Sequence, residues 1–561
     1  MKIERAALLH RAQGSDACPL PDGRFFLRLF AREGDILEAY VIYGDRGASS
    51  TPVPLSEKSM EKVAASAGRE TFEVYLSHVP ERLFYAFRLV GREETVYFLD
   101  GFARPSIENQ CCEGRLIDNR EEFFTYPYDL RSERVSLPPW WEKANVYNIF
   151  PDSFVCGRKN NVQAPSRLGG TFKNIEEKLP YLKDLGIDCL YLNPVFKAAS
   201  YHRYDTSEYF ACDEALGRDE AFLSLVQKAH RLGLKVMVDG VFNHTGRGFF
   251  AFKDLEEKGE ASPYRKWYYR VAFPLWKDDG SPNYACFGYC PDMPKLDTSN
   301  PEVIAYFARG AADFSRRFQI DGWRLDVANE VDKNFWRAFK KEVLSARPSS
   351  IFLAEIWGGA EAWLAHDLFD STMNYEFARI ARFFFAYGKL DVQGLADELN
   401  GLLDRYAPPF AGAQLNLLDS HDVPRFHSLV RGDKRKYRSA LALLYLFPGV
   451  PSLFYGDEKG LDGIVENDYR RAMAWNHSPF EEDIKALIAL RKRLPSTRPS
   501  IEAADDGFQL RYRSKEGRFA VLFSGNREVP IQIPPESTLL YQNGFEDGSL
   551  LPFGCLVYRL P

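Results

Sequence analysis

Asp321-Gly-Trp-Arg-Leu-Asp326 is a short apolar stretch that ends on an acidic residue, and two later stretches have the same form. They are Ile351-Phe-Leu-Ala-Glu355 and Leu415-Asn-Leu-Leu-Asp-Ser-His-Asp422. Apolar runs of this length are typical of buried strands. In a closed barrel of parallel strands, the carboxyl ends meet at one mouth, where the catalytic residues of such barrels lie. The three stretches therefore predict one site that holds all three terminal acids.

A simpler explanation is available for each acid, because Asp often caps the helix that follows a strand. For a single acid the two explanations are balanced. Three acids, with Arg324 near the first and His421 next to the third, favour a shared site over three unrelated caps. Two carboxyl groups in one site hydrolyse a glycosidic bond, one as the acid/base and the other as the nucleophile.

The chain of 561 residues is longer than one hydrophobic core usually supports, so we expect about two to four domains. Its hydrophobic content of 45% and charged content of 27% are typical of globular enzymes. The net charge of -6 and the lack of a basic tract argue against nucleic acid as a partner. No apolar run approaches the length of about 20 residues that crosses a bilayer, so we expect no membrane association.

The N-terminal stretch Met1–His10 lacks the long apolar run of a signal peptide, which predicts a cytoplasmic protein. The nine cysteines are an odd number and are scattered along the chain. Cys111 and Cys112 are adjacent, and Cys286 and Cys290 have no matching His or Cys pair nearby. We therefore expect free thiols, with neither a zinc site nor a disulfide framework.

The sequence pattern divides the chain into three parts. Residues 1–124 alternate apolar and polar positions between Gly, Pro and Asp residues, which predicts an N-terminal β-sandwich. Residues 125–498 alternate strand-like and helix-like segments, which predicts a (β/α)8 TIM barrel, with an inserted domain at about 244–300. Residues 499–561 return to short strands and predict a small C-terminal all-β domain. The fold class is thus multidomain, with a central α/β barrel.

Particular segments support this division. Predicted strands of the sandwich are Phe25–Phe30, Leu37–Tyr43, Thr71–Ser77, Leu83–Leu89 and Thr95–Leu99. Besides the three acid-bearing stretches, predicted barrel strands are Val146–Phe150, Cys189–Phe196, Lys235–Phe242, Ser371–Phe377 and Pro451–Asp457. Helical spacing marks Asn174–Leu185, Asp219–Leu232 and Glu302–Phe318, and Ser136–Trp141 is typical of a linker.

The residues themselves suggest how the chemistry is divided. Asp326 is the predicted nucleophile, because the side chain of Arg324 projects from the same strand face and favours an ionised carboxylate. Glu355 is the predicted acid/base, since the apolar neighbours Ile356 and Trp357 favour its protonated form by desolvation. Asp422 is left to bind sugar hydroxyls more tightly in the transition state.

Several segments together resemble the α-amylase family, glycoside hydrolase family 13. They are Asp239-Gly-Val-Phe-Asn-His244, Gly322-Trp-Arg-Leu-Asp-Val-Ala-Asn-Glu330, Glu355-Ile-Trp357 and Leu418-Asp-Ser-His-Asp422. Met293-Pro-Lys-Leu-Asp297, together with Val327-Ala-Asn-Glu330, is similar to the neopullulanase, cyclomaltodextrinase and maltogenic amylase subgroup. The N-terminal sandwich looks like the starch-binding-type module of that subgroup.

The resemblance implies a retaining hydrolase that cleaves α-1,4 and α-1,6 bonds in cyclodextrins, pullulan, starch fragments and maltooligosaccharides, with some transglycosylation. It also implies a homodimer. Alternatives within the family are a glucanotransferase, an α-glucosidase or an endo-amylase, and a non-catalytic glycan-binding protein is a further alternative. By position, Asp326, Glu355 and Asp422 resemble the family's nucleophile, acid/base and transition-state stabiliser. Resemblance assigns the substrate-binding positions to His202, Tyr204, His244, Arg324, His421, Asn329, Glu330, Glu466 and Arg470.

The chain departs from the family pattern at several positions. The subgroup often binds calcium after the first barrel strand, but Gly157-Arg-Lys-Asn-Asn161 places basic residues there and Gly169-Gly-Thr171 lacks an acid. We therefore expect no metal and no cofactor, and we expect Asn243, a calcium ligand in many α-amylases, to be structural. Glu466 stands where Asp is usual, and Asp297 where Asn is usual. Gly358 stands where His is common, and we expect the smaller residue to open the acceptor side.

Overall fold

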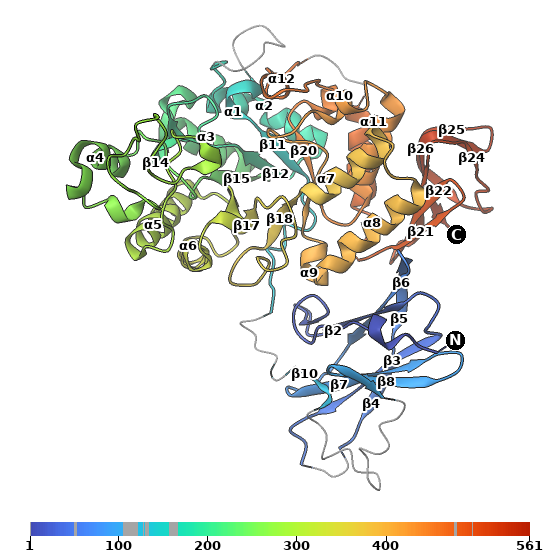
Figure 1. The fold of residues 1–561 in the computed structure, drawn as a ribbon. Helices are drawn as coiled ribbons and strands as arrows, with labels where there is room; N and C mark the ends of the chain where they lie inside the picture. The colour runs from blue at the N-terminus through green and yellow to red at the C-terminus, as the bar shows by residue number, and fades with distance from the viewer. Residues whose placement is uncertain are drawn as a thin grey trace.

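Eight parallel strands close into a barrel at the centre of the computed structural model (Figure 1). The structure describes residues 2–49, 53–104, 122–126, 128, 134–155, 167–475, 480–495 and 497–561. The barrel strands are, in order, β11 (Val146–Ile149), β12 (Cys189–Leu192), β15 (Lys235–Gly240), β16 (Gly322–Leu325), β17 (Ile351–Ala354), β18 (Ser371–Asn374), β19 (Leu415–Leu417) and β20 (Val450–Phe454). β20 pairs with β11 and closes the barrel, which confirms the predicted fold.

Helices surround these strands, as the helical spacing predicts. They are α1 (Pro151–Phe154), α2 (Phe172–Leu185), α3 (Arg218–Arg231), α5 (Pro301–Phe318), α6 (Lys333–Ala346), α7 (Tyr375–Ala381), α8 (Val392–Arg405), α9 (Pro408–Ala411), α10 (Phe426–Leu429), α11 (Lys434–Leu446), α12 (Glu466–Tyr469) and α13 (Glu481–Arg491). In α5, the Asn300 side chain caps the helix by accepting from Glu302 N at 2.8 Å, and Val303, Phe307 and Phe314 are buried. The helix therefore has one apolar face, which packs on the barrel.

Several predicted barrel strands end earlier than the sequence pattern suggests, since β15, β19 and β20 end at Gly240, Leu417 and Phe454. In two further strands a particular residue ends the strand. Cys189–Phe196 is interrupted at Asn193-Pro194, so β12 is separate from β13 (Phe196–Ala198), which pairs with β14 (Thr206–Cys212) in a two-stranded sheet. Proline lacks the N–H that a central strand needs. Ser371–Phe377 changes to helix after Asn374, because the Asn374 side chain accepts from Phe377 N at 3.1 Å and caps α7.

The inserted segment forms one wall above the barrel mouth. It contains α4 (Phe250–Lys258) and short helical turns at Gly259–Ala261, Arg265–Trp267 and Phe287–Tyr289. An isolated bridge from His244 to Lys295 returns the segment to the residues that follow β15, and a bridge from Cys286 to Pro294 lies within the segment. The ends of the inserted segment are therefore fixed next to the last residues of β15, at the barrel mouth.

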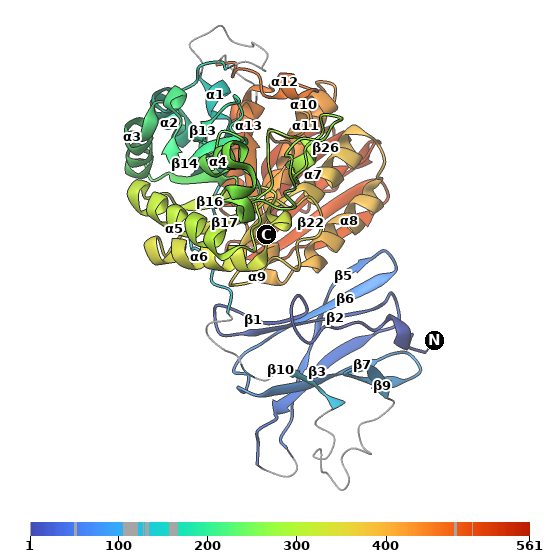
Figure 2. The ribbon, with the colours of Figure 1, turned by 60° about the vertical axis from the view of Figure 1, so that its left-hand side comes forward.

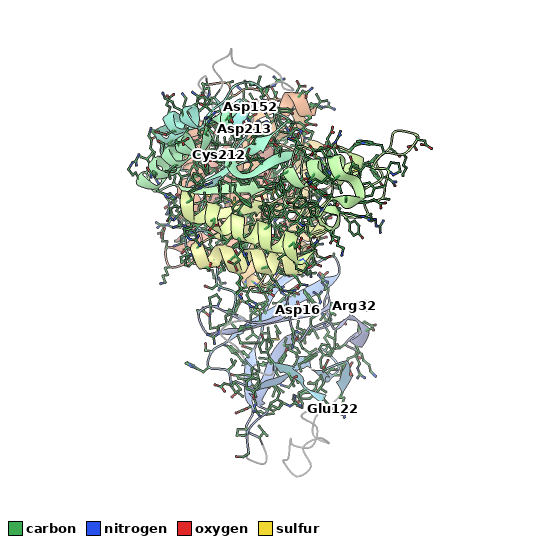
Figure 3. All side chains as sticks on the ribbon, turned by 90° about the vertical axis from the view of Figure 1, so that its left-hand side faces the viewer. Asp16, Arg32, Glu122, Asp152, Cys212 and Asp213 are labelled. Atoms are coloured by element: carbon green, nitrogen blue, oxygen red, sulfur yellow. The ribbon has the colours of Figure 1, made fainter. Side chains whose placement is uncertain are left out.

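The N-terminal part is a sandwich of two antiparallel sheets that lies beside the barrel (Figures 1 and 2). One sheet has the order β1 (Ala17–Pro19), β2 (Phe25–Arg32), β6 (Arg69–Leu76), β5 (Glu61–Ser66). The other has β4 (Ser56–Ser59), β3 (Glu38–Asp45), β7 (Leu83–Val90), β8 (Thr95–Leu99) and β9 (Phe102–Arg104), with β10 (Phe124–Tyr126) on β7. Figure 3 shows the two bodies with side chains, with Asp16 and Arg32 in the sandwich and Asp152 in the barrel.

A buried ionic network joins the three parts of the chain. Arg28 of β2 pairs with Glu73 at 2.8 Å and donates to the carbonyl oxygen of Asp404 at 2.9 Å. Arg498 pairs with the Asp404 carboxylate at 2.5 Å and with Glu73 at 3.4 Å. Arg498 lies just before the C-terminal sheet, and its side chain contacts both the sandwich and α8.

The C-terminal part is one antiparallel sheet that packs on α11. Its strands are β21 (Ser500–Ala504), β22 (Gly507–Ser514), β23 (Gly517–Ser524), β24 (Val529–Pro530), β25 (Thr538–Glu546) and β26 (Ser549–Leu560). Cysteines 18, 189, 212, 286, 290 and 555 are free, and the other three, among them the Cys111-Cys112 pair, lie outside the described residues. Within the described ranges, every helix is too short or too polar to cross a membrane.

Candidate active site

A cavity of about 640 Å³ lies at the carboxyl ends of the barrel strands. All three predicted catalytic acids line it, so they face a common space. Other predicted residues that line it are His202, Tyr204, His244, Asn329, Glu330, Glu466 and Arg470. Arg324 and His421 are fully buried and form part of its floor through contacts with these residues.

Arg324 is the electrostatic centre of the floor. Its Nη1 lies 2.7 Å from Asp326 Oδ1 and 2.9 Å from Asp239 Oδ1, and its Nη2 lies 2.9 Å from Glu355 Oε2. The contact with Asp326 is the one that strand alternation predicts for two residues on the same face. One guanidinium therefore ties together carboxylates from the ends of three neighbouring strands.

Glu355 accepts from two further donors. Val327 N donates to its Oε2 at 3.0 Å, and the indole N–H of Trp357 donates to its Oε1 at 3.0 Å. The sequence predicts that Trp357 acts on Glu355 by desolvation, whereas in the structure the polar edge of the indole donates to the carboxyl group. The Trp357 ring stacks on Tyr375 with centroids 4.1 Å apart, and the residue is 53% exposed and lines the cavity.

The backbone at Val327 is unusual. Val327 directly follows Asp326 and has φ 44° and ψ 45°, a left-handed conformation that β-branched residues rarely adopt. The turn directs its N–H to Glu355. Such conformations persist where the surrounding structure enforces them, and they cluster at active sites. Here the strained turn links the two acids that are predicted to act on the bond.

Asp422 is oriented by one guanidinium group and a histidine. His421 Nε2 lies 2.9 Å from Asp422 Oδ2, and Arg470 Nη2 lies 3.4 Å from Asp422 Oδ1. Asn193 Nδ2 donates to His421 Nδ1 at 3.0 Å, which leaves the Nε2 proton of His421 for the carboxylate. Arg470 also pairs with Glu466, so these residues form a continuous polar wall on one side of the cavity.

Tyr204 connects the floor to the histidines. Its hydroxyl donates to Asp239 Oδ2 at 2.9 Å and lies 2.5 Å from His421 Nε2, and the two rings are parallel at 5.5 Å. The N–H of Tyr204 donates to His202 Nδ1 at 3.1 Å, so the proton of the neutral His202 ring is on Nε2. Burial lowers the pKa of His202 below its usual value. His202 is therefore a neutral donor.

His244 is neutral as well, and both of its ring nitrogens contact the protein. Its Nε2 donates to the carbonyl oxygen of Tyr204 at 3.2 Å, and its Nδ1 accepts from Asn243 at 3.3 Å. Burial lowers the pKa of His244 to about 3. Its ring stacks on Phe287 with centroids 4.9 Å apart. A bond from His244 to a sugar would have to replace its bond to Tyr204.

Burial and charge act in opposite directions on the acids. Burial, reinforced by the neighbouring Glu355, raises the pKa of Asp326 well above its usual value, and Arg324 opposes this rise. For Asp422, burial alone would raise the pKa, but His421 and the nearby guanidinium groups hold it below its usual value. The site therefore keeps Asp422 ionised, while burial and a neighbouring acid favour the protonated form of Asp326 and Arg324 opposes this.

Sequence reasoning missed part of this floor. Asp239 is fully buried and bonds to Arg324 and to the hydroxyl groups of Tyr191 and Tyr204, each at 2.9 Å. The signal was present, because Asp239 is an acid near the end of an apolar strand, like Asp326. Asn193 gave no such signal, since a single amide after a strand is common. Phe287 and Met293, which also line the cavity, come from the inserted segment.

A lysine contacts Asn243, the residue that the sequence predicts to be structural rather than a calcium ligand. The Lys295 ammonium group contacts the side-chain oxygen of Asn243, the backbone oxygen of Glu330 at 3.1 Å and Glu330 Oε2 at 3.4 Å. This cluster of oxygens already surrounds a positive charge supplied by the chain. In the loop where the subgroup often binds calcium, the Thr171 hydroxyl accepts from Asn174 N at 3.2 Å and caps α2, while residues 157–161 lie outside the described ranges.

Comparison with known proteins agrees with this geometry. The model of the α-amylase catalytic domain matches residues 148–512, and that of the α-amylase N-terminal Ig-like domain matches residues 1–128. Neopullulanase 2 of Thermoactinomyces vulgaris is 38% identical over 514 residues, which cover 87% of this chain and 85% of that protein. A cyclomaltodextrinase of Geobacillus thermopakistaniensis is 34% identical over 560 residues, 95% of this chain and 93% of that one.

Solved structures give the same result. The structure of a cyclomaltodextrinase is 28% identical in sequence, covers 99% of both chains and superposes with a TM-score of 0.88. The cyclic α-maltosyl-(1→6)-maltose hydrolase of Arthrobacter globiformis is 31% identical, covers 76% of this chain and all of that one, and has a TM-score of 0.68. Family models, relatives and structures thus agree, and the chain is a glycoside hydrolase that belongs to the α-amylase family.

Proposed function

We propose that this enzyme cleaves α-1,4-glucosidic bonds in cyclodextrins, pullulan and short maltooligosaccharides with retention of configuration. The observation that carries the proposal is that Asp326, Glu355 and Asp422 line one cavity while Arg324 contacts the first two. Retention requires a nucleophilic carboxylate and a proton donor on opposite sides of one bond.

In the proposed mechanism, Asp326 attacks C1 of the bound glucose and Glu355 protonates the leaving oxygen. The sugar ring becomes cationic as the bond breaks, and a positive charge beside Asp326 favours its ionised form. The attack requires an ionised Asp326, and protonation of the leaving oxygen requires a proton on Glu355. Water then attacks the glycosyl-enzyme bond, and Glu355, now ionised, accepts its proton.

Asp422 stabilises the transition state by accepting hydrogen bonds from sugar hydroxyls. Its low pKa keeps it ionised throughout the cycle. His421 and Arg470 fix its two oxygens, so little reorganisation is needed when the sugar binds. The neutral Nε2–H of His202 supplies a further donor to the same ring.

The test is a product profile with β-cyclodextrin, pullulan and soluble starch. We expect β-cyclodextrin to yield maltose and glucose, and Asp326→Asn to reduce kcat by at least about 10⁴-fold with an unchanged fold by circular dichroism. Starch turned over much faster than β-cyclodextrin would reassign the enzyme as an endo-amylase. Retained activity in the variant would remove the nucleophile assignment.

Transglycosylation and cleavage of α-1,6 bonds are two further activities that the acceptor side supports. The exposed face of Trp357 offers a stacking surface, and no atom lies within 4 Å of where a Cβ of Gly358 would be. The Arthrobacter relative is named for an α-(1→6) substrate. Rising maltose concentration should shift the product from free sugar to longer oligosaccharides. An unchanged product ratio would exclude the transfer activity.

We further propose that the enzyme uses no calcium at Asn243, because the Lys295 ammonium group already neutralises the surrounding oxygens. EDTA should then leave kcat and Tm unchanged. Lys295→Ala should lower Tm, and added calcium should restore part of the loss by binding the vacated oxygens. A wild-type enzyme that chelators inactivate would refute the proposal.

A cytoplasmic location and a homodimer complete the proposal. The free described cysteines fit a reducing compartment, and a Bacillus subtilis relative 34% identical over 510 residues is named an intracellular maltogenic amylase. The dimer rests on the resemblance of the N-terminal module to that of the subgroup. Light scattering at enzyme concentrations used for assay should give twice the chain mass, and the monomer mass would refute it.

A further inference from the structure

The loop of residues 199–205 supplies three side chains to the cavity region. His202 and Tyr204 line the cavity, and Tyr201 accepts from Arg470 at 3.2 Å. The loop joins β13 to β14, which form a two-stranded sheet of their own. An isolated two-stranded sheet is only marginally stable, so other contacts must fix the position of the loop.

Arg203 lies between the two cavity-lining residues, but its side chain is turned away from solvent and is only 1% exposed. Its φ is +64°, in the left-handed region that disfavours residues with a Cβ. Its N–H donates to Ser200 Oγ at 3.2 Å, and its carbonyl oxygen accepts from Thr206 Oγ1 at 3.1 Å. The backbone of Arg203 is thus held on both sides in a conformation that it would not adopt alone.

The guanidinium group of Arg203 holds the loop in place through two hydrogen bonds. Nε donates to Asp213 Oδ2 at 2.6 Å, and Nη1 donates to the carbonyl oxygen of Tyr201 at 2.9 Å. Asp213 directly follows β14 and caps the next helical turn by accepting from Ala215 N at 2.9 Å. Figure 3 shows Asp213 in the upper part of the barrel. The guanidinium therefore joins the loop backbone to a residue that is fixed by regular structure.

The position of the loop matters to the reacting groups through Tyr204. Its hydroxyl bonds to Asp239 and lies 2.5 Å from His421, which in turn contacts Asp422. A shift of the loop would therefore change the hydrogen bonds of two carboxylates at once. Misplacement of catalytic groups by about 1 Å can reduce the rate by about 100-fold.

We infer that Arg203 is a positioning residue, which presents His202 and Tyr204 to the reacting sugar through its buried ion pair with Asp213. This inference rests on the proposed function of the same cavity. Arg203 touches no cavity atom itself and acts through its neighbours. The residue type matters, because a lysine would keep the charge but would not offer two donors in the fixed geometry of a guanidinium.

The chain offers a matched control in Arg167. Its Nη1 lies 3.2 Å from the same Asp213 oxygen, and its Nη2 donates to the carbonyl oxygen of Ala198, but its side chain is 38% exposed. Arg167→Met removes one cation from Asp213 without touching the 199–205 loop. The presence of Arg167 also means that Asp213 keeps a counterion in an Arg203 variant, which favours folding.

The experiment compares Arg203→Met, Arg203→Lys and Arg167→Met on β-cyclodextrin and maltotriose, with kcat, KM and Tm measured for each. We expect Arg203→Met to lower kcat by about 10- to 100-fold with a smaller change in KM. Arg203→Lys should recover part of that loss, and Arg167→Met should keep kcat within about twofold of the wild type. Equal kcat losses in the Met variants, or none in Arg203→Met, would overturn the inference.

A double-mutant cycle separates positioning from general stability. In a Tyr204→Phe background, Arg203→Met should reduce kcat by less than it does in the wild type, because the bond that it positions is already absent. Independent effects would refute action through Tyr204. A wild type inactive on both sugars would instead refute the proposed function, so the two failures are distinguishable.

Discussion

Arg324→Met is the sharpest test of the electrostatics of the cavity floor. The guanidinium group is fully buried and contacts Asp239, Asp326 and Glu355 within 2.9 Å. Removing one partner of a buried ion pair costs about 3–5 kcal/mol, because the remaining charge stays uncompensated. We therefore expect the variant to be inactive and to lose about 4 kcal/mol of unfolding free energy near neutral pH.

The barrel unit, from Val146 to Arg491, has about 350 residues and so an unfolding entropy of about 0.7 kcal/mol per kelvin. A loss of about 4 kcal/mol then lowers Tm by about 5–6 °C at pH 7.5. The deficit should depend on pH in a definite direction. Burial already raises the pKa values of Asp239 and Asp326, and Arg324 opposes both shifts. Its removal raises both pKa values further.

A carboxyl group whose pKa is higher in the folded than in the unfolded state binds more protons when folded. Stability then rises as pH falls from the folded pKa towards the unfolded pKa of about 4. Each pH unit in this window restores up to about 1.4 kcal/mol for each extra proton. The Tm deficit of Arg324→Met should therefore shrink by about half or more between pH 7.5 and pH 5.5.

Differential scanning calorimetry of the wild type and the variant at both pH values measures this deficit. Arg324→Met/Asp239→Asn is the control, because it also removes one of the orphaned carboxylates and should recover part of the lost Tm at pH 7.5. A deficit that is equal or larger at pH 5.5 would refute the account. So would a double variant less stable than the single one.

Three further predictions concern other features of the structure. Arg498→Met should lower the unfolding free energy by about 2 kcal/mol, less than for a fully orphaned pair, because Asp404 and Glu73 keep other partners. Calorimetry should show the loss, and limited proteolysis should show earlier release of the N-terminal sandwich, whereas unchanged cleavage would contradict a stabilising role for the buried ionic network. Val327→Gly should raise the unfolding free energy by about 1 kcal/mol. It relieves a strain of about 1–3 kcal/mol at a φ of 44°, and the glycine adds an entropy cost of about 0.5–1 kcal/mol. A lower Tm would mean that packing of the valine side chain outweighs the strain. Gly358→His should fold with unchanged Tm, because no atom beyond the neighbouring residues lies within 4 Å of the new Cβ. It should reduce the yield of transfer products at high maltose. An unchanged yield would show that acceptors bind elsewhere.

Much of the architecture follows from local patterns. The apolar strands and amphipathic helices alternate regularly, and a barrel is the arrangement that buries both faces of eight such strands. The predicted ends were wrong where a side chain changed the backbone. Asn374 ends β18 by capping α7, and Asn193-Pro194 ends β12. Such interruptions depend on hydrogen bonds that periodicity does not encode.

The site was predictable in its acids and less so in their surroundings. Asp326 and Glu355 were predicted because each ends an apolar run, and Asp422 because it lies shortly after one, next to His421. The contact of Trp357 with Glu355 could not, since the orientation of an indole ring depends on its stacking with Tyr375. The network of Asn193 likewise depends on the distance between strands far apart in the sequence. Long-range geometry, rather than residue type, supplies this information.

The residues of the cavity come from loops that are spread from Asn193 to Arg470. During synthesis, the sandwich can fold as soon as it emerges from the ribosome, because domains fold as units from the N-terminus. The barrel must wait for β20 to pair with β11. A nascent chain that stalls before the eighth strand therefore carries a folded N-terminal sandwich but no complete catalytic centre, and truncated translation products should have no hydrolase activity.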